Sequence, residues 1–101
     1  MATTTKALAR TALTTSTGTT LYTVPSATTT VISSIVVANT AATSSTVTVA
    51  LDGVSLLPTV SIPANSVTTI DVKQVLATTK TITGGASTTA VSIHISGVEI
   101  A

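Results

Sequence analysis

Apolar residues along this chain recur at every second position, in short segments separated by turn-forming residues. The alternation is clearest over 46–51, where valine and leucine alternate with threonine and alanine. Successive side chains of a β-strand point to opposite faces, so this period of two predicts strands with one buried face. The residues predicted to be buried are Val47, Val49, Leu51, Ile70, Val91, Ile93 and Ile95.

Turn signals separate the segments at the short, regular spacing that is typical of a sandwich or barrel. Asp52-Gly53 predicts a two-residue hairpin loop, and Gly84-Gly85 predicts a second loop. Pro58 has no N–H to donate, so 54–62 is expected to lie at a sheet edge or to be split in two. Strands are expected over 21–24, 28–38, 46–51, 54–62, 67–72, 80–83 and 90–100, with one helical turn over 73–76.

Two segments depart from a simple one-sided alternation. The segment 28–38 is apolar on both faces, with Val31, Ile35 and Val37 on one and Ile32, Val36 and Ala38 on the other. Only one face of a sheet meets the core of a two-layer sandwich, so the second face needs a cover, either the N-terminal segment or another subunit.

The last strand changes phase at its end, because Val98 and Ile100 follow Gly97 out of step with the apolar residues before it. A bulge at Ser96-Gly97 would return both side chains to the core, and this is the expected arrangement. The alternative is an unbroken strand whose tail serves a second surface.

Residues 1–19 differ from the rest, since they are mostly Thr, Ala and Ser and offer only Leu8 and Leu13 as large apolar side chains. They are interpreted as an extended arm that can add as a strand to a neighbouring subunit, followed by a sandwich domain over 20–101. An ordinary edge strand of the same domain is the alternative, and the sequence leaves both open.

Composition strengthens the β prediction and adds a second feature. Thr, Val and Ile make up close to half of the chain, and these β-branched residues favour strands over helices. The sequence therefore predicts an all-β fold, a single sandwich of about seven or eight strands. Only 7% of residues are charged and the net charge is +1, far below an ordinary soluble domain, which suits a part held beside copies of itself.

Membrane and nucleic-acid roles are not expected. The mean hydropathy is +0.67, but no apolar run approaches the ~18 residues that a spanning helix needs. The four basic residues are dispersed, and Tyr22 is the only aromatic residue on which a base or sugar could stack. Tyr22 is instead expected in the core, with its hydroxyl at the rim.

Residues suited to catalysis are few and scattered. Asp52, Asp71, Glu99 and His94 lie apart in the sequence, and His94 between Ser92 and Ser96 lacks a neighbouring acid. With one His and no Cys there is no ligand set for a metal. The chain is therefore not expected to be an enzyme, to hold a cofactor or to act on a small-molecule substrate.

Four stretches carry a family resemblance: "TTLYTVPSATTTVISSIVVANT", "VTVALDG", "IPANSVTTIDV" and the closing "VSIHISGVEI". Together they resemble small virion structural proteins of tailed bacteriophages, over Leu8 to Ile100. The resemblance implies an immunoglobulin-like or jelly-roll-like β-sandwich without catalytic residues. It also implies a role as a capsid decoration (cement) protein or as an accessory part of a tail, baseplate or fibre.

The expected function is therefore a capsid decoration protein that binds and stabilises the outside of the head, in a virion assembled in the host cytoplasm. The alternatives are a tail, baseplate or fibre subunit and a non-catalytic adhesin or ligand-binding module. The expected partners are the major capsid protein or other virion subunits and further copies of this chain, with a trimer possible. The candidate subunit contacts are Lys6, Leu8, Arg10, Leu13, Ile32 and Val36.

Overall fold

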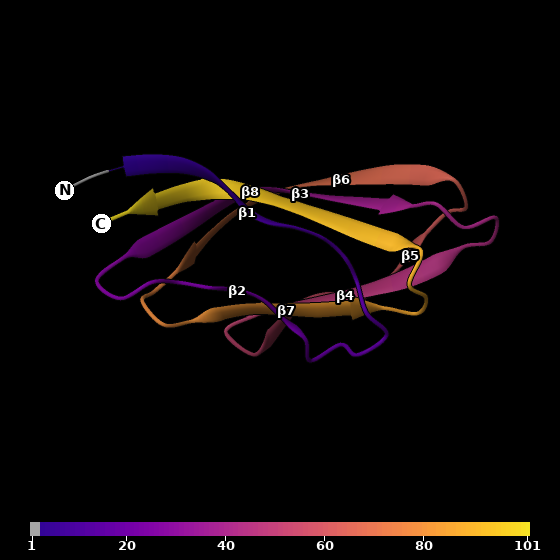
Figure 1. Cartoon of the computed structure of the whole chain (residues 1–101), viewed down its shortest axis with the longest axis horizontal. Helices are drawn as coiled ribbons and strands as arrows, with labels where there is room; N and C mark the ends of the chain where they lie inside the picture. Colours follow the sequence, from indigo (N-terminus) through magenta and orange to yellow (C-terminus); the bar gives the residue numbers. More distant parts are fainter. Residues whose placement is uncertain (1–2) are drawn as a thin grey trace.

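The fold is an all-β sandwich, as the sequence predicts. A computed structural model describes residues 3–101, and within that range the regular structure consists of eight strands without a helix. Two antiparallel four-stranded sheets face each other, and β1 begins at the same end of the molecule at which β8 ends (Figure 1). The strands are β1 (Thr3–Ala12), β2 (Thr20–Thr23), β3 (Thr29–Asn39), β4 (Ser45–Leu51), β5 (Val54–Ile62), β6 (Ser66–Leu76), β7 (Thr81–Ala86) and β8 (Val91–Ile100).

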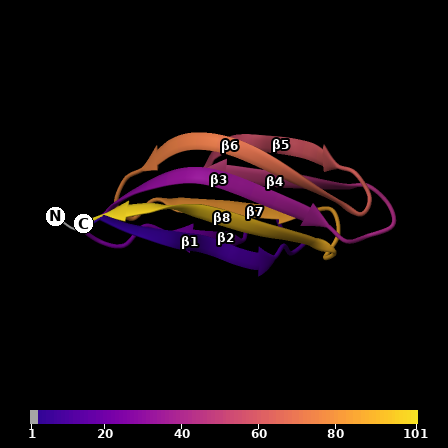
Figure 2. The same cartoon turned by 90° about the horizontal axis from the view of Figure 1, so that it is seen from above.

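The strand order is that of a jelly roll. Sheet A has the order β1-β8-β3-β6, and sheet B has the order β2-β7-β4-β5 (Figure 2). Hydrogen-bonded pairs nest around the β4–β5 hairpin, since β3 pairs with β6, β2 with β7 and β1 with β8. One long antiparallel ribbon rolled into two sheets gives this nesting, which is the double-sheet jelly-roll arrangement. Of the two sandwich types that the resemblance implies, the chain adopts the jelly roll.

The β4–β5 hairpin forms where the sequence predicts it. Leu51 pairs with Val54 across a two-residue loop, and Asp52 and Gly53 have φ values of 53° and 76°. A primed turn needs positive φ at both positions, which Asp and Gly tolerate. Pro58 lies in β5, and β5 is an edge strand of sheet B as expected.

The core between the sheets contains the residues that alternation predicts. Six of the seven are buried, and Ile70 is half-buried beside them on β6. Tyr22 is 9% exposed, with its ring in the core as expected.

Two local predictions are wrong. The segment 73–76 is not a helical turn but the end of β6, where Val75 and Leu76 pair with β3. Gly84-Gly85 is not a loop but part of β7, paired with Val49 and Thr48. A Cβ on Gly85 would overlap the backbone carbonyl of Ser16, so Gly85 lets the loop after β1 lie close to the sheet.

The faces of β3 differ from the prediction because the strand contains a bulge. Its register against both neighbours shifts between Ile32 and Ser34, so the alternation changes phase there. Ile32, Ile35 and Val37 therefore all point inward and are fully buried, while Val36 is half-buried on the other side. Ile32 does not belong to the second face.

The end of β8 also differs from the expected arrangement, since burial alternates through Gly97 without a change of phase. The shifts lie in the neighbouring strands β1 and β3 instead. Glu99 points between the sheets, as its contact with Tyr22 shows, so Val98 and Ile100 point outward. The strand is therefore unbroken, as in the alternative, and its last apolar side chains lie on the outer surface of sheet A.

The N-terminal segment forms an edge strand. Residues 3–12 pair with β8 from Thr3 to Ala12, with one register shift between Ala7 and Ala9. Leu8 and Leu13 are 7% and 1% exposed, so the segment contributes to the core. Of the two alternatives for residues 1–19, the edge strand describes 3–12, and residues 1–2 lie outside the described range.

Candidate functional site

The residues suited to acid–base chemistry lie in separate places. Asp52 is at the β4–β5 turn, where it pairs with Lys80 at 3.7 Å. Asp71 is on the outer side of β6, His94 is opposite Val36 on the outer side of β8, and Glu99 lies between the sheets. Within residues 3–101 no three His, Asp or Glu side chains gather as a metal-binding group.

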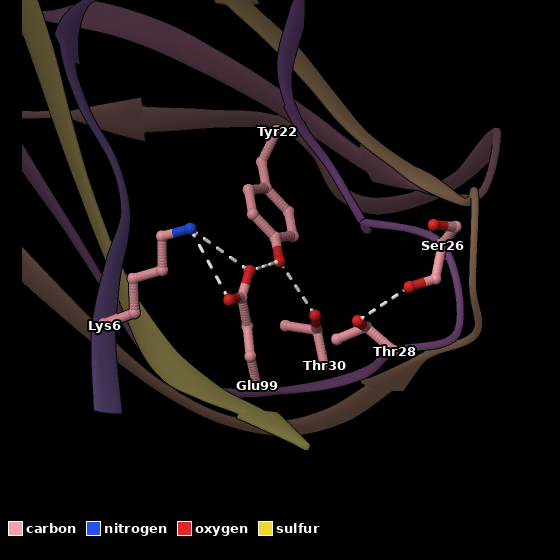
Figure 3. A network of polar contacts seen from close by, with 6 residues as sticks. All are labelled: Lys6, Tyr22, Ser26, Thr28, Thr30 and Glu99. Carbon is pink, nitrogen blue, oxygen red and sulfur yellow. Dashed lines mark hydrogen bonds and ion pairs between the residues drawn. The ribbon is translucent and has the colours of Figure 1, made fainter. Parts of the chain in front are cut away.

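A polar network joins the two sheets at the end of the sandwich where β1 begins and β8 ends (Figure 3). The Tyr22 hydroxyl, from β2 in sheet B, donates to the Glu99 carboxylate of β8. Its oxygen lies 2.8 Å from Oγ1 of the buried Thr30 on β3. Because the phenol's one proton goes to the carboxylate, Thr30 donates to Tyr22. Lys6 Nζ on β1 completes the network, 3.3 Å from Glu99 Oε2.

The network shifts the pKa of both of its acids. The Tyr22 hydrogen bond, assisted by Lys6, holds the pKa of Glu99 below its ordinary value, although partial burial opposes this. Burial and the nearby carboxylate raise the pKa of Tyr22. Both shifts favour a neutral Tyr22 phenol and an ionised Glu99 carboxylate, and these two forms make the hydrogen bond that links the sheets.

This network links the two sheets and stabilises the ionised form of Glu99. The Glu99 side chain is 15% exposed, and each of its partners is a donor that stabilises the charged form. A catalytic acid or base would need a pKa moved toward neutrality, whereas both shifts here move away from it.

The candidate contact residues divide between the core and the surface. Leu8, Leu13 and Ile32 are buried within the chain itself, and Lys6 is engaged with Glu99. Only Arg10 and Val36 lie on the outer surface of sheet A, where Arg10 is opposite His94 in the register of β1 and β8.

The outer face of sheet A is the largest feature that remains. Val67 and Val75 on β6 are 63% and 66% exposed. Val98 and Ile100 on β8, which β3 separates from β6, are half-buried. The outer face is defined here by Ala7 and Arg10 of β1, His94, Ser96, Val98 and Ile100 of β8, Val31, Val36 and Ala38 of β3, and Val67, Asp71 and Val75 of β6. Exposed aliphatic side chains such as those of Val67 and Val75 are unfavourable in water.

A shallow hollow of about 420 Å³ lies on this face between β1, β8 and β3. Arg10, Ser33 and Ser96 contribute polar groups to its lining, and Ala7 and Val98 contribute apolar ones. The bulges in β1 and β3 flank β8 at this point, so the hollow is a consequence of the register shifts. Sequence reasoning missed the hollow and the exposed Val67 and Val75. It placed Val98 and Ile100 on a second surface only as the alternative to a bulge.

Comparison with known proteins does not assign the chain to a family. No family model and no curated protein matches the chain. Among solved structures it is similar to an exo-beta-1,3-galactanase from Phanerochaete chrysosporium with beta-1,3-galactotriose, with 21% identity and a TM-score of 0.47. The match covers 97% of this chain and 29% of that one. Residues 3–101 contain no helix long and apolar enough to cross a membrane.

Proposed function

We propose that this chain is a virion structural protein of a tailed bacteriophage, and that it decorates the outer surface of the capsid and stabilises it. The observation that carries the proposal is the apolar outer face of sheet A. Threonine would favour strand structure as well as valine does at the outward positions of sheet A, and its hydroxyl would hydrogen-bond to water. Val67 and Val75, more than 60% exposed, therefore indicate that the face is covered in an assembly.

The low charge of the chain supports the same proposal. Seven percent of residues are charged, so copies placed side by side repel one another little. A small part present in many copies also needs only weak individual contacts, because multiplicity raises the overall strength of attachment.

The edge strand β1 provides a route to the capsid itself. One side of β1 pairs with β8, and its other side is the edge of sheet A. An extended segment of the major capsid protein can add there through main-chain hydrogen bonds. The jelly roll is compatible with this role but does not select it, since lectins and cupins share the architecture with viral capsid proteins.

Cryo-electron microscopy of the phage whose genome encodes this chain tests the proposal. Regular density on the head surface is expected, absent from particles grown without the gene and restored by adding purified chain. Density confined to the tail would replace decoration by the tail-subunit alternative, and a chain absent from purified particles would contradict a virion role.

A matched pair of variants tests the observation on which the proposal rests. Val36 on β3 and Thr48 on β4 are both half-buried on the outer side of a central strand, in sheets A and B respectively. Val36→Asp is expected to reduce incorporation into particles strongly, and Thr48→Asp is expected to leave it nearly unchanged. Equal incorporation of both variants would show that the outer face of sheet A is not used.

A further inference from the structure

Two charged side chains of opposite sign lie on the outer face of sheet A without an ionic partner in their own chain. Arg10 is on β1, at one edge of the sheet, and Asp71 is on β6, at the other edge. Within residues 3–101 the ion pairs are Lys6–Glu99 and Lys80–Asp52, and neither Arg10 nor Asp71 makes a side-chain hydrogen bond. Three strand spacings of about 4.8 Å separate their strands, too far for the two to meet within one chain.

The register places the two charges at nearly the same height along the sheet. Arg10 is level with His94, Val36 and Thr69 across the four strands. Asp71 is two residues from Thr69 along β6, which is about 7 Å. An extended arginine side chain covers such an offset.

A two-fold axis parallel to the strands brings these charges together between two copies. If two outer faces of sheet A meet about an axis that runs between β8 and β3, each β1 lies over the partner's β6. Arg10 of each copy then faces Asp71 of the other, so one contact becomes two by symmetry. The central strands meet as well, with β8 over the partner's β3, and their apolar outer side chains cover each other.

The hollow fits the same arrangement. It lies between β1 and β8 at the level of Ser96, and in the register of sheet A this is the level of Asp71. In the two-fold arrangement the partner's Asp71 therefore lies over the hollow. There it meets the Arg10 guanidinium and the Ser96 hydroxyl, both of which can donate to a carboxylate. The Ser33 hydroxyl already donates to the Ser96 carbonyl oxygen.

The area of the outer face of sheet A limits how tightly two copies can associate. Four strands about 4.8 Å apart and about ten residues long at 3.3 Å each give roughly 600 Å² per copy. Two copies would bury roughly 1,200 Å², which is the lower limit for specific protein–protein interfaces. Such a dimer dissociates on dilution, and its ends remain free for other contacts.

We propose that a second copy of this chain covers the outer face of sheet A, in a dimer whose two-fold axis runs parallel to the strands and pairs Arg10 of each copy with Asp71 of the other. The inference goes beyond the proposed virion role and does not rest on it. It is tested on the purified chain without any particle, so the two proposals fail separately.

Charge reversal with rescue is the test. Sedimentation equilibrium of the full chain, from about 1 µM to about 1 mM, is expected to show a monomer–dimer equilibrium. Arg10→Asp and Asp71→Arg each place two like-charge contacts in the dimer and are expected to weaken it at least roughly tenfold. The double variant exchanges both charges and is expected to return the dissociation constant to within about threefold of the wild type.

Two control variants carry the same charge reversals away from the face. Lys80→Asp and Asp52→Arg alter the exposed ion pair in the loops next to sheet B and are expected to leave the dimer unchanged. Thermal unfolding of every variant at low concentration verifies the fold. A chain that stays monomeric up to 1 mM, a closed trimer, or single reversals that the double variant does not rescue would each overturn the inference.

Discussion

The outer faces of the two sheets differ in a way that strand propensity does not explain. On the central strands of sheet B the outward residues are mainly threonine: Thr46 and Thr48 on β4, Thr81 and Thr83 on β7. On the central strands of sheet A the corresponding residues include Val31, Val36, Val98 and Ile100. Valine and threonine have the same branched shape and both favour strands. Sheet B therefore shows that this fold can be built with hydroxyls outside, and the aliphatic groups of sheet A point to contact with another molecule.

The largest expected effect is the difference in stability between substitutions on the inner side and on the outer side of β8. Ile95 on β8 is fully buried, and Val98 on the same strand points outward. Ile95→Ala is expected to lower the free energy of unfolding by about 2–5 kcal/mol, because it leaves a cavity in the core. Val98→Ala is expected to cost less than about 1 kcal/mol in the monomer. Urea unfolding at low protein concentration measures both, and equal losses would show that Val98 belongs to the core.

A smaller effect is expected at Gly97, where atoms of β3 and β1 lie close to β8. A Cβ there would overlap the Val31 carbonyl oxygen and come within 2.9 Å of Leu8 Cδ1. Gly97→Ala is therefore expected to destabilise the chain by about 1–3 kcal/mol. Gly18→Ala is the control, since nothing lies within 4 Å of its Cβ position. A neutral Gly97→Ala variant would contradict the register of β8 against its neighbours.

The link between the sheets is expected to contribute less again. Tyr22→Phe removes the hydrogen bonds to Glu99 and Thr30 and is expected to cost about 1 kcal/mol near neutral pH. Lys6→Met is expected to cost less, because the Lys6 side chain is 47% exposed and its ion pair is screened by water. A Lys6→Met loss that exceeds the Tyr22→Phe loss would contradict this description of the network.

The same network predicts the pH dependence of stability. The folded pKa of Glu99 lies below its ordinary value of 4.5, so between these values the unfolded chain binds a proton that the folded chain does not. The contribution of Glu99 to the free energy of unfolding is complete above pH 4.5 and is lost as the pH falls through the folded pKa. The Tyr22 pKa is raised above 10.0, so its contribution is complete below pH 10.0 and is lost as the pH rises through the folded value.

Urea midpoints from about pH 3 to about pH 11 measure both limbs. Glu99→Gln is expected to flatten the acid limb, and Tyr22→Phe is expected to flatten the alkaline limb. A wild-type acid limb that Glu99→Gln leaves unchanged would show that other groups cause it.

Sequence alternation predicts the inner face of this fold well and the outer face poorly. In β4 and β8 a strict period of two identifies Val47, Val49, Ile93 and Ile95 as core residues. The β3 bulge escapes prediction because it falls at Ser33-Ser34, and two serines carry no preference for either face. Alternation continued through the bulge therefore assigns Ile32 to the same face as Val36, whereas Ile32 points into the core and Val36 points outward.

The network of Tyr22 and Glu99 escapes prediction for a different reason. Its members lie 77 residues apart, and only the nested pairing of the jelly roll brings β2 and β8 together at one end of the sandwich. Likewise, Arg10 and Asp71 are isolated charges in the sequence. Only the strand order β1-β8-β3-β6 shows that they lie on the two opposite edge strands of one sheet.

The central claim is that the outer face of sheet A, and not that of sheet B, is the contact surface between copies. Backbone amide chemical shifts of the isotope-labelled full chain, recorded across a dilution series, test it directly. The predicted result is that shifts of β3 and β8 residues around Val36 and His94 change with concentration, while those around Thr48 and Thr83 stay constant. Concentration-dependent shifts confined to sheet B, or shifts that are constant everywhere, would contradict the account.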